Sequence, residues 1–309
     1  MFVPFISVPS NERLKKLYRR KGGGGGGRGG GGGGGGGGKS GSTGSSGISG
    51  SSAGGGRSTP ISSGGTSRSA TPYGAGGGKA APIPAGQPFA GRESGGGTRS
   101  QVYGTQQYGS GYPGVASRGV GGLGFPFVFW PLAWGGIAGV GAGAYLHNSE
   151  YGRPNNSSRP GGPLATAAFV SNSANTTYRL LADNATVTSL IVDIKEKCSS
   201  NLNGSTSAAP SPYEDSLTAL PQPEQSVQYY RASTVALTLD GYNNTAIFQQ
   251  EGTPDVPLPN NIDKNLLACL NQTIGEAVPL VTSGVPGLTA PNLSVLALFW
   301  LVWTLSSLF

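Results

Sequence analysis

The stretch GLGFPFVFWPLAWGGIAGVGAGAYL, residues 122–146, decides which architecture the sequence predicts. It carries no charged side chain, and its last 22 residues would extend about 33 Å as a helix, enough to cross the apolar core of a bilayer. It also contains three residues of the types that favour the membrane interface: Trp130, Trp134 and Tyr145. We therefore expect residues 119–146 to form a Gly-rich hydrophobic transmembrane segment, against which stand the helix breakers Pro126 and Pro131.

Glycines recur at every fourth position of this stretch, at Gly135, Gly139 and Gly143. On a helix they would form one smooth face that a second helix can approach closely. A Gly-rich background also produces such spacing by chance. The pattern predicts a helix-packing face through which two copies of the chain self-associate.

The net charge of the chain changes sign at the start of this hydrophobic stretch. Residues 1–118 carry 14 Lys/Arg and two acids, a net +12, whereas residues 119–309 carry seven Lys/Arg and 12 acids, a net −5. A basic flank on one side of a hydrophobic segment is typical of a membrane protein whose basic side is cytosolic. The alternative is a basic linker that merely adjoins an acidic domain.

The first part of the chain predicts no fold. Residues 1–21 form a basic segment that does not have the layout of a signal peptide, because its short apolar run precedes the basic cluster. Residues 22–118 are Gly- and Ser-rich with few Leu, Ile or Val, so we expect them to be disordered. The stretch from Tyr103 to Tyr112 spaces tyrosines among Gly, Ser and Gln, which predicts weak self-association of this arm. A single Arg-Gly-Gly triplet does not make an RNA-binding region, so we do not expect a nucleic-acid partner.

The second part has the signs of lumenal or extracellular exposure. Chance predicts about three Asn-x-Ser/Thr sequons in residues 147–292, and this region contains eight: Asn155, Asn156, Asn175, Asn184, Asn203, Asn243, Asn271 and Asn292. The two cysteines of the chain, Cys198 and Cys269, both lie in this region, as one disulfide in an oxidising compartment requires. Two unpaired buried thiols are the alternative.

Between linkers at residues 147–162 and 277–292, the pattern of residues 163–276 predicts a small glycosylated α+β domain. Strands are expected at 165–170, 177–182 and 227–239, followed by a turn at 240–244 that leads into 245–249. Apolar residues at helical spacing predict helices at 186–198 and 261–274, each with one cysteine on its apolar face. The Ser/Pro-rich insert 199–223 reads as a loop. The predicted fold class is thus a small disulfide-linked α+β domain after a long disordered Gly-rich region, with one or two hydrophobic membrane segments.

The second of those segments is the tail, residues 293–309, LSVLALFWLVWTLSSLF. It is apolar and has no basic residue after it, which favours a GPI-attachment signal over a stop-transfer helix. Ser283 and Gly284 are the expected attachment site, and a retained C-terminal anchor is the alternative. Either way, the expected partner is membrane lipid.

Nothing in the residues predicts an enzyme. The one histidine, His147, directly follows the hydrophobic stretch, and no His/Cys cluster has metal-ligand spacing. The carboxylates Asp183, Asp193, Glu196, Asp240 and Asp263 stand where helix caps, turns and solvated faces need them. We expect no cofactor and no metal.

Several short stretches resemble a family of uncharacterised Gly-rich membrane or secreted proteins of mushroom-forming fungi. They are residues 71–79 (TPYGAGGGK), 83–91 (IPAGQPFAG), 109–114 (GSGYPG), 145–154 (YLHNSEYGRP), 159–163 (RPGGP) and 239–244 (LDGYNN). Together they cover roughly residues 70–280. The resemblance implies an extracellular protein with a signal peptide ahead of the Gly-rich region, from which this chain departs over its first 21 residues. It implies no activity. A looser, architectural likeness is to prion-type proteins.

The expected function is a non-enzymatic, membrane-attached glycoprotein of the cell surface or secretory pathway, structural or adhesive in the cell envelope, with residues 147–292 outside. One alternative is a ligand-binding or signalling ectodomain on a membrane stalk, and another is an RNA-associated Gly-rich protein. Two topologies stay open. An internal signal-anchor at residues 119–146 would leave the Gly-rich arm cytosolic, whereas a signal peptide would place the arm outside.

Overall fold

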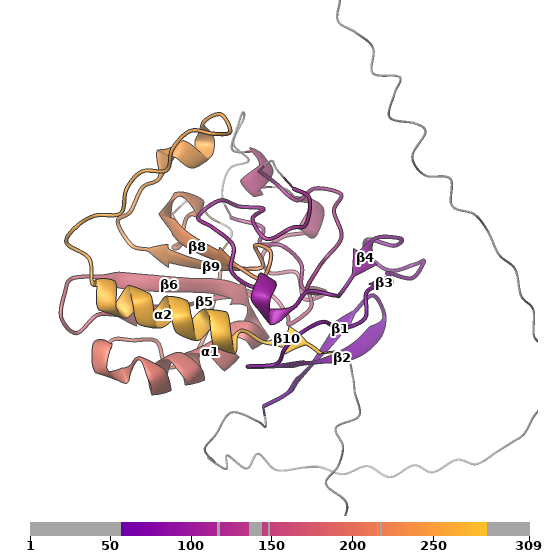
Figure 1. The fold of residues 1–309 in the computed structure, drawn as a ribbon, viewed down its shortest axis with the longest axis horizontal. Helices are drawn as coiled ribbons and strands as arrows, with labels where there is room; N and C mark the ends of the chain where they lie inside the picture. Colours follow the sequence, from indigo (N-terminus) through magenta and orange to yellow (C-terminus); the bar gives the residue numbers. More distant parts are fainter. Residues whose placement is uncertain are drawn as a thin grey trace, which may run out of the picture. The chain divides into compact units, whose positions relative to one another are not determined.

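The computed structural model describes residues 57–115, 118–135, 144–147, 149–214, 216 and 218–282. Its centre is a five-stranded antiparallel sheet (Figure 1). In spatial order the strands are β7 (Ser211–Pro212), β5 (Leu164–Val170), β6 (Thr177–Asp183), β9 (Val235–Leu239) and β8 (Ser226–Tyr230). Two α-helices, α1 (Asn184–Lys197) and α2 (Lys264–Ala277), pack side by side on one face of this sheet.

Both faces of the sheet are covered. Successive strand residues point to opposite faces, so Leu180 and Tyr230 face the helices, while Leu181 and Tyr229 face the other way. All four are buried. The strand β9, which lies between β6 and β8, is buried at every position for this reason.

A smaller sheet joins the two ends of the described chain. It consists of β1 (Thr59–Ser63), β2 (Thr66–Thr71) and β10 (Leu280–Val281), with β2 in the middle. A third pairing joins β3 (Ala81–Pro82) to β4 (Glu93–Ser94). The remaining regular elements are short 3₁₀ helices at Arg99–Gln101, Ala144–His147, Ser149–Tyr151, Ser199–Asn201, Pro223–Gln225 and Thr245–Phe248.

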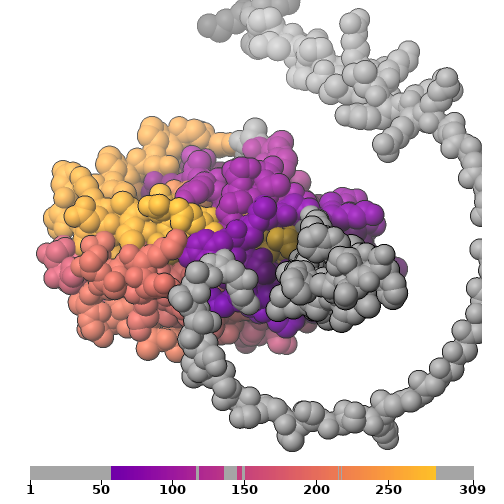
Figure 2. Space-filling model, turned by 60° about the horizontal axis from the view of Figure 1, so that its bottom comes forward, coloured from indigo at the N-terminus to yellow at the C-terminus, as the bar shows by residue number. Residues whose placement is uncertain are grey.

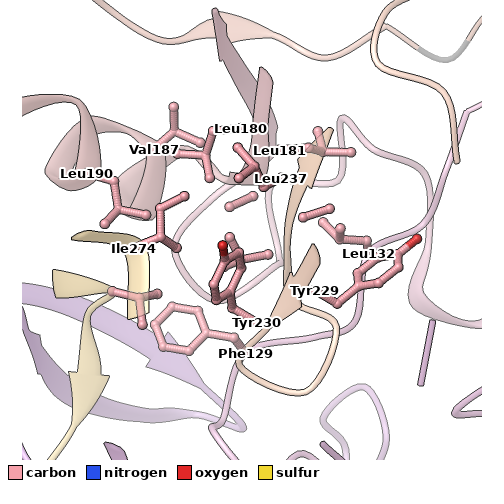
Figure 3. Packing of buried hydrophobic residues seen from close by; sticks show 14 of the residues in the cluster. Phe129, Leu132, Leu180, Leu181, Val187, Leu190, Tyr229, Tyr230, Leu237 and Ile274 are labelled. Atoms are coloured by element: carbon pink, nitrogen blue, oxygen red, sulfur yellow. The ribbon is translucent and has the colours of Figure 1, made fainter. Parts of the chain in front are cut away.

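The predicted transmembrane segment is wrong. Residues 125–135 belong to the core and form no helix: Phe125, Phe129 and Leu132 are at most 2% exposed. Figure 3 shows Phe129 and Leu132 in one cluster with side chains of the sheet and of both helices. Among the described residues, no helix is both long and apolar enough to cross a membrane.

The backbone of this stretch explains why it is not helical. Pro126 and Pro131 interrupt any helix, and Val128 has a positive φ of 75°. Its N–H groups bond to other parts of the chain, as in Leu132 N–H to the Ser233 carbonyl. Gly135 donates to the Tyr213 hydroxyl and lies buried in the domain, so it is not part of a helix-packing face; Gly139 and Gly143 lie outside the described residues.

The prediction that residues 22–118 are disordered is wrong from residue 57 onward. Residues 57–115 and Arg118 are part of the fold, and in Figure 2 their indigo and magenta surfaces lie directly against the orange and yellow surfaces of later residues. In the arm expected to self-associate, Tyr108 and Tyr112 are buried. Tyr103 is 47% exposed and packs on Tyr230.

The arginines of this N-terminal part bind the C-terminal part. Arg99 donates to the carbonyls of Gly275 and Val278 at the end of α2, and Arg118 donates to three carbonyls of residues 246–249. Arg57 pairs with Asp193 and Arg92 with Glu150. Residues 57–115 and Arg118 of the basic part and the acidic part of the chain therefore belong to one domain, so a membrane does not separate these residues.

The predicted small α+β domain needs correction as well. The structure is mainly β-structure, with two α-helices among the described residues, and extends from residue 57 to residue 282. The strands at 165–170 and 177–182 and both helices are present with shifted ends. The stretch 227–239 is a hairpin of two strands, and 245–249 begins as a 3₁₀ helix.

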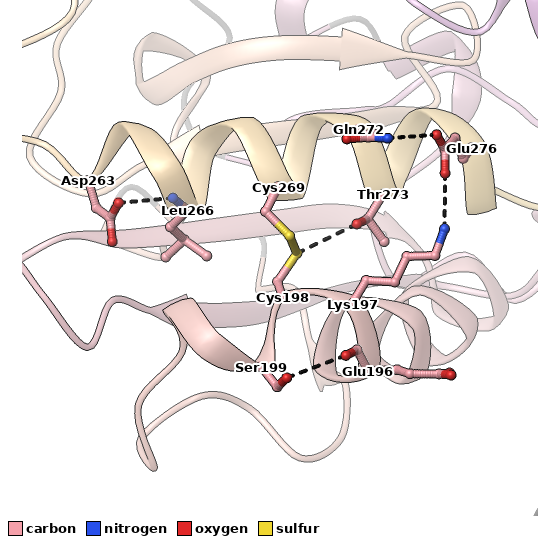
Figure 4. Close-up of a disulfide and its surroundings, with 10 residues drawn as sticks. All are labelled: Glu196, Lys197, Cys198, Ser199, Asp263, Leu266, Cys269, Gln272, Thr273 and Glu276. Atoms are coloured by element: carbon pink, nitrogen blue, oxygen red, sulfur yellow. Dashed lines mark hydrogen bonds and ion pairs between the residues drawn. A yellow bond between two sulfur atoms is a disulfide. The ribbon is translucent and has the colours of Figure 1, made fainter.

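The predicted disulfide between Cys198 and Cys269 is confirmed. Figure 4 shows it linking the C-terminal end of α1 to the middle of α2, beside the hydroxyl of Thr273. Asp183 and Asp263 cap the two helices, as expected of carboxylates at these places. The predicted attachment site at Ser283 and Gly284, the tail and residues 1–56 lie outside the described residues.

Candidate functional site

The main candidate site is a cleft of about 510 Å³ next to the N-terminus of α1. It is formed by the β1–β2 hairpin, the turn at residues 83–88, residues 157–162, Trp130, and Ala185 of α1. We call it the serine-lined cleft. Its lining consists of Pro60, Ile61, Ser62, Ser63, Gly64, Gly65, Ile83, Gln87, Pro88, Trp130, Ser157, Ser158, Arg159, Gly161, Gly162 and Ala185.

The floor and the rim of the cleft differ in chemistry. Ile61, Ile83, Trp130 and Arg159 are each at most 7% exposed and form the floor. The rim is exposed and carries hydroxyl and amide groups, from Ser62, Gln87, Ser157 and Ser158. A ligand in this cleft would meet an aromatic and cationic floor and hydrogen-bonding groups around it. Among the lining residues there is no carboxylate, histidine or thiol.

Arg159 is the charged residue of the floor. Its guanidinium lies 5.7 Å from the centre of the Trp130 ring and donates to the carbonyls of Trp130, Pro131 and Tyr151. Its Nε–H is buried without a partner. Burial lowers the pKa of Arg159 to about 10, while the charge of Asp183 acts in the opposite direction. The side chain is therefore protonated at neutral pH.

Below the cleft lies a buried ion pair. Arg231, with no exposed side-chain surface, donates to Asp183 at 2.6 Å and stacks on Phe129 at 3.5 Å. Gly161 covers this pair: its φ is +87°, and a Cβ placed there would lie 1.9 Å from an oxygen of Asp183. Only glycine fits this position. A larger residue at position 161 would therefore disturb both the wall of the cleft and the ion pair beneath it.

Three predicted glycosylation sites border the cleft. Ser157 and Ser158 are the hydroxyl residues of the sequons at Asn155 and Asn156, and Ala185 is the middle residue of the sequon at Asn184. The sequon asparagines that are exposed are Asn155, Asn175, Asn184 and Asn243, and those that are partly buried are Asn156, Asn203 and Asn271. Asn292 lies outside the described residues.

Two sequon asparagines, Asn271 and Asn203, make hydrogen bonds to distant parts of the chain, and we expect them to carry the least glycan. The side chain of Asn271 accepts a hydrogen bond from Tyr230 at 2.7 Å within α2, and that of Asn203 donates to the Ser171 carbonyl at 2.9 Å. A glycan at either position would compete with these contacts as the chain folds. Site-by-site mass spectrometry after enzymatic deglycosylation should therefore give higher occupancy at Asn175 and Asn243. Higher occupancy at Asn271 than at Asn175 would contradict this, and no glycan anywhere would contradict the predicted secretory placement.

Sequence reasoning did not assemble this cleft. It assigned Trp130 to a membrane interface, treated Ser157 and Ser158 only as sequon residues, and passed over Ser62 and Gln87. No local pattern could have joined residues 60–65, 83–88 and 157–162, because the contacts between them are tertiary. The single histidine, His147, lies half-buried in a 3₁₀ helix and does not line the cleft.

Comparisons with known proteins add no assignment: no family model, curated protein or solved structure matches this chain. Within the described residues, no group of three His, Cys, Asp or Glu side chains is placed to hold a metal ion.

Proposed function

We propose that this chain is a non-enzymatic glycoprotein of the cell surface or secretory pathway that binds saccharide through the serine-lined cleft. The observation that carries the proposal is the composition of the cleft, in which the aromatic residue Trp130 lies at the floor and hydroxyl and amide groups form the rim. Its role would be adhesive or structural in the cell envelope.

Sugars suit this combination of groups. A pyranose ring has an apolar C–H face that packs on an aromatic or aliphatic surface, and hydroxyls around its edge that need hydrogen-bonding partners. Trp130 and Ile83 supply such a surface, and Ser62, Gln87 and Ser157 supply donors and acceptors. The absence of a carboxylate, histidine or thiol from the cleft lining favours binding over hydrolysis.

The proposed placement outside the cytosol is supported by the disulfide and by the number of sequons. Attachment to membrane lipid would come from residues 293–309, through a lipid anchor at Ser283 or Gly284 or through a retained tail. The resemblance to Gly-rich fungal surface proteins agrees with this placement.

The RNA-binding alternative is less well supported. Phosphate binding needs basic side chains that are free to contact a backbone. The described part of the Gly-rich region has six basic residues. Arg57 and Arg92 pair with acids, and Arg68, Arg99 and Arg118 donate to carbonyls, so among them the exposed Lys79 is the one left to contact a phosphate.

The proposal predicts that rim substitutions weaken saccharide binding without affecting stability. The double variant Ser62→Ala, Gln87→Ala removes two exposed hydrogen-bonding groups and keeps every sequon. We expect about tenfold weaker binding of the best oligosaccharide found on a glycan array, from the loss of two hydrogen bonds. Isothermal titration calorimetry measures the affinity.

The matched control is Ser200→Ala, Gln250→Ala, which changes the same two residue types at exposed positions outside the cleft. It should bind like the unmodified protein. Equal loss in both variants, or no saccharide bound by the unmodified protein, would contradict the proposed function.

A further inference from the structure

The cleft has a positive charge in its floor that no acid of the protein neutralises directly. Among the described residues, the ion pairs involve Arg57, Arg92, Arg179, Lys197 and Arg231, but not Arg159. We infer that the cleft is selective for saccharides that carry a carboxylate, such as uronic acids. This inference rests on the proposed function and specifies its ligand.

The surroundings of Arg159 distinguish it from the buried Arg231 and from the partly buried Arg99. Arg231 has the carboxylate of Asp183 as its direct partner. Arg99 donates to the Gly74 carbonyl and to two carbonyls at the C-terminal end of α2, where the helix dipole supplies negative charge. Arg159 has only the carbonyls of residues 130, 131 and 151, none of them in an α-helix.

The nearby Asp183 does not cancel this charge. Its oxygens accept hydrogen bonds from Arg231 and from the N–H and hydroxyl of Thr186, so it is already shared between a cation and a helix cap. Arg159, Asp183 and Arg231 together carry a net charge of +1. A buried charge acts more strongly on its neighbourhood than an exposed one, because the protein around it screens less than water does.

The cleft is where a counter-ion can approach. Arg159 forms part of its floor while being 4% exposed, and the lining contains no acid that would repel an anion. The hydroxyls of Ser157 and Ser158 are exposed beside it and can donate to a carboxylate. Trp130, which packs against the Arg159 guanidinium, lines the cleft together with Ile61 and Ile83, and the exposed parts of these three side chains can contact the sugar ring.

The test compares ligands that differ only in charge. Calorimetry on the full glycosylated chain would use an oligouronate, its methyl ester and the neutral oligosaccharide of the same linkage. We expect the oligouronate to bind about tenfold more tightly than the methyl ester, a difference of one decade in Kd. Equal affinity for all three would overturn the inference while leaving the proposed function intact, whereas binding of none would overturn both.

A sulfated oligosaccharide of the same length separates carboxylate recognition from attraction of any anion. Tighter binding of the sulfated ligand than of the oligouronate would overturn the assignment to carboxylates. Arg159→Gln removes the charge and Arg159→Lys keeps it, so the preference for the oligouronate over its methyl ester should disappear only in Arg159→Gln. If Arg159→Gln does not fold, as circular dichroism would show, the comparison of ligands on the unmodified chain still decides.

Discussion

Replacing Asp183 by Ala is expected to lower the free energy of unfolding by about 3–5 kcal/mol, the usual effect of removing one partner of a buried ion pair. The side chains of Arg231 and Asp183 are 0% and 5% exposed, so water cannot solvate the arginine that remains. The same substitution removes the N-cap of α1, because Asp183 accepts a hydrogen bond from the Thr186 N–H at 3.0 Å.

Urea unfolding followed by circular dichroism measures this effect. The control is Asp240→Ala, which breaks the pair between Arg179 and Asp240, each 25% exposed, and should cost about 0.2–1 kcal/mol. The double variant Asp183→Ala, Arg231→Met should lose less than Asp183→Ala alone, since no buried charge is left unpaired. Equal effects of Asp183→Ala and Asp240→Ala would show that the buried pair contributes no more to the free energy of unfolding than the partly exposed one.

Removing the disulfide is expected to have an effect of similar size. The bond joins residues 71 positions apart, and closing a loop of that length stabilises a fold by about 4 kcal/mol in the chain-entropy account. The double variant Cys198→Ser, Cys269→Ser should therefore unfold at a clearly lower urea concentration. Cys198 is fully buried, so its serine hydroxyl adds a further cost unless Thr273, the present neighbour of its sulfur, accepts a hydrogen bond from it.

The control for this variant is chemical reduction of the unmodified protein. Reduction should lower the stability by about as much as the double serine variant, because both open the same loop. Lys197→Ala, which removes an exposed ion pair beside the disulfide, should cost less than about 1 kcal/mol. A double serine variant as stable as the unmodified protein would show that the contacts between α1 and α2 suffice to hold the helices together.

The elements that local patterns could predict were those with strong periodicity. Residues 165–170 and 177–182 are short runs of strand-favouring residues on either side of a Ser/Asn-rich turn, and the helices that begin at Asn184 and Lys264 have capping aspartates and apolar faces. The hairpin between β8 and β9 was missed because its turn, Arg231–Ala232–Ser233, has positive φ at all three residues without a Gly or Asn.

The larger errors came from composition. A run of apolar residues predicts burial but does not say whether lipid or protein provides it, and here Phe129 and Leu132 are buried by the sheet and helices. The high glycine content predicted disorder, yet some of these glycines allow other parts of the chain to pack closely against the backbone. A Cβ at Gly97 would lie 2.5 Å from the Phe127 ring, so this glycine lets an aromatic side chain rest on the backbone. The cleft depended on these same segments and could not be predicted without them.

The small sheet has a mechanical consequence. Its register places both Thr59, at the start of β1, and Val281, at the end of β10, opposite Ala70 of β2. The two ends of the described chain therefore leave the domain two strand spacings apart, about 10 Å. Tension between them would pull β1 and β10 away from β2, perpendicular to the strands. The hydrogen bonds of the sheet would then break one after another and not all at once. The sheet would yield first, and the tension would then reach α2, which is separated from β10 by two residues and is held to α1 by the disulfide.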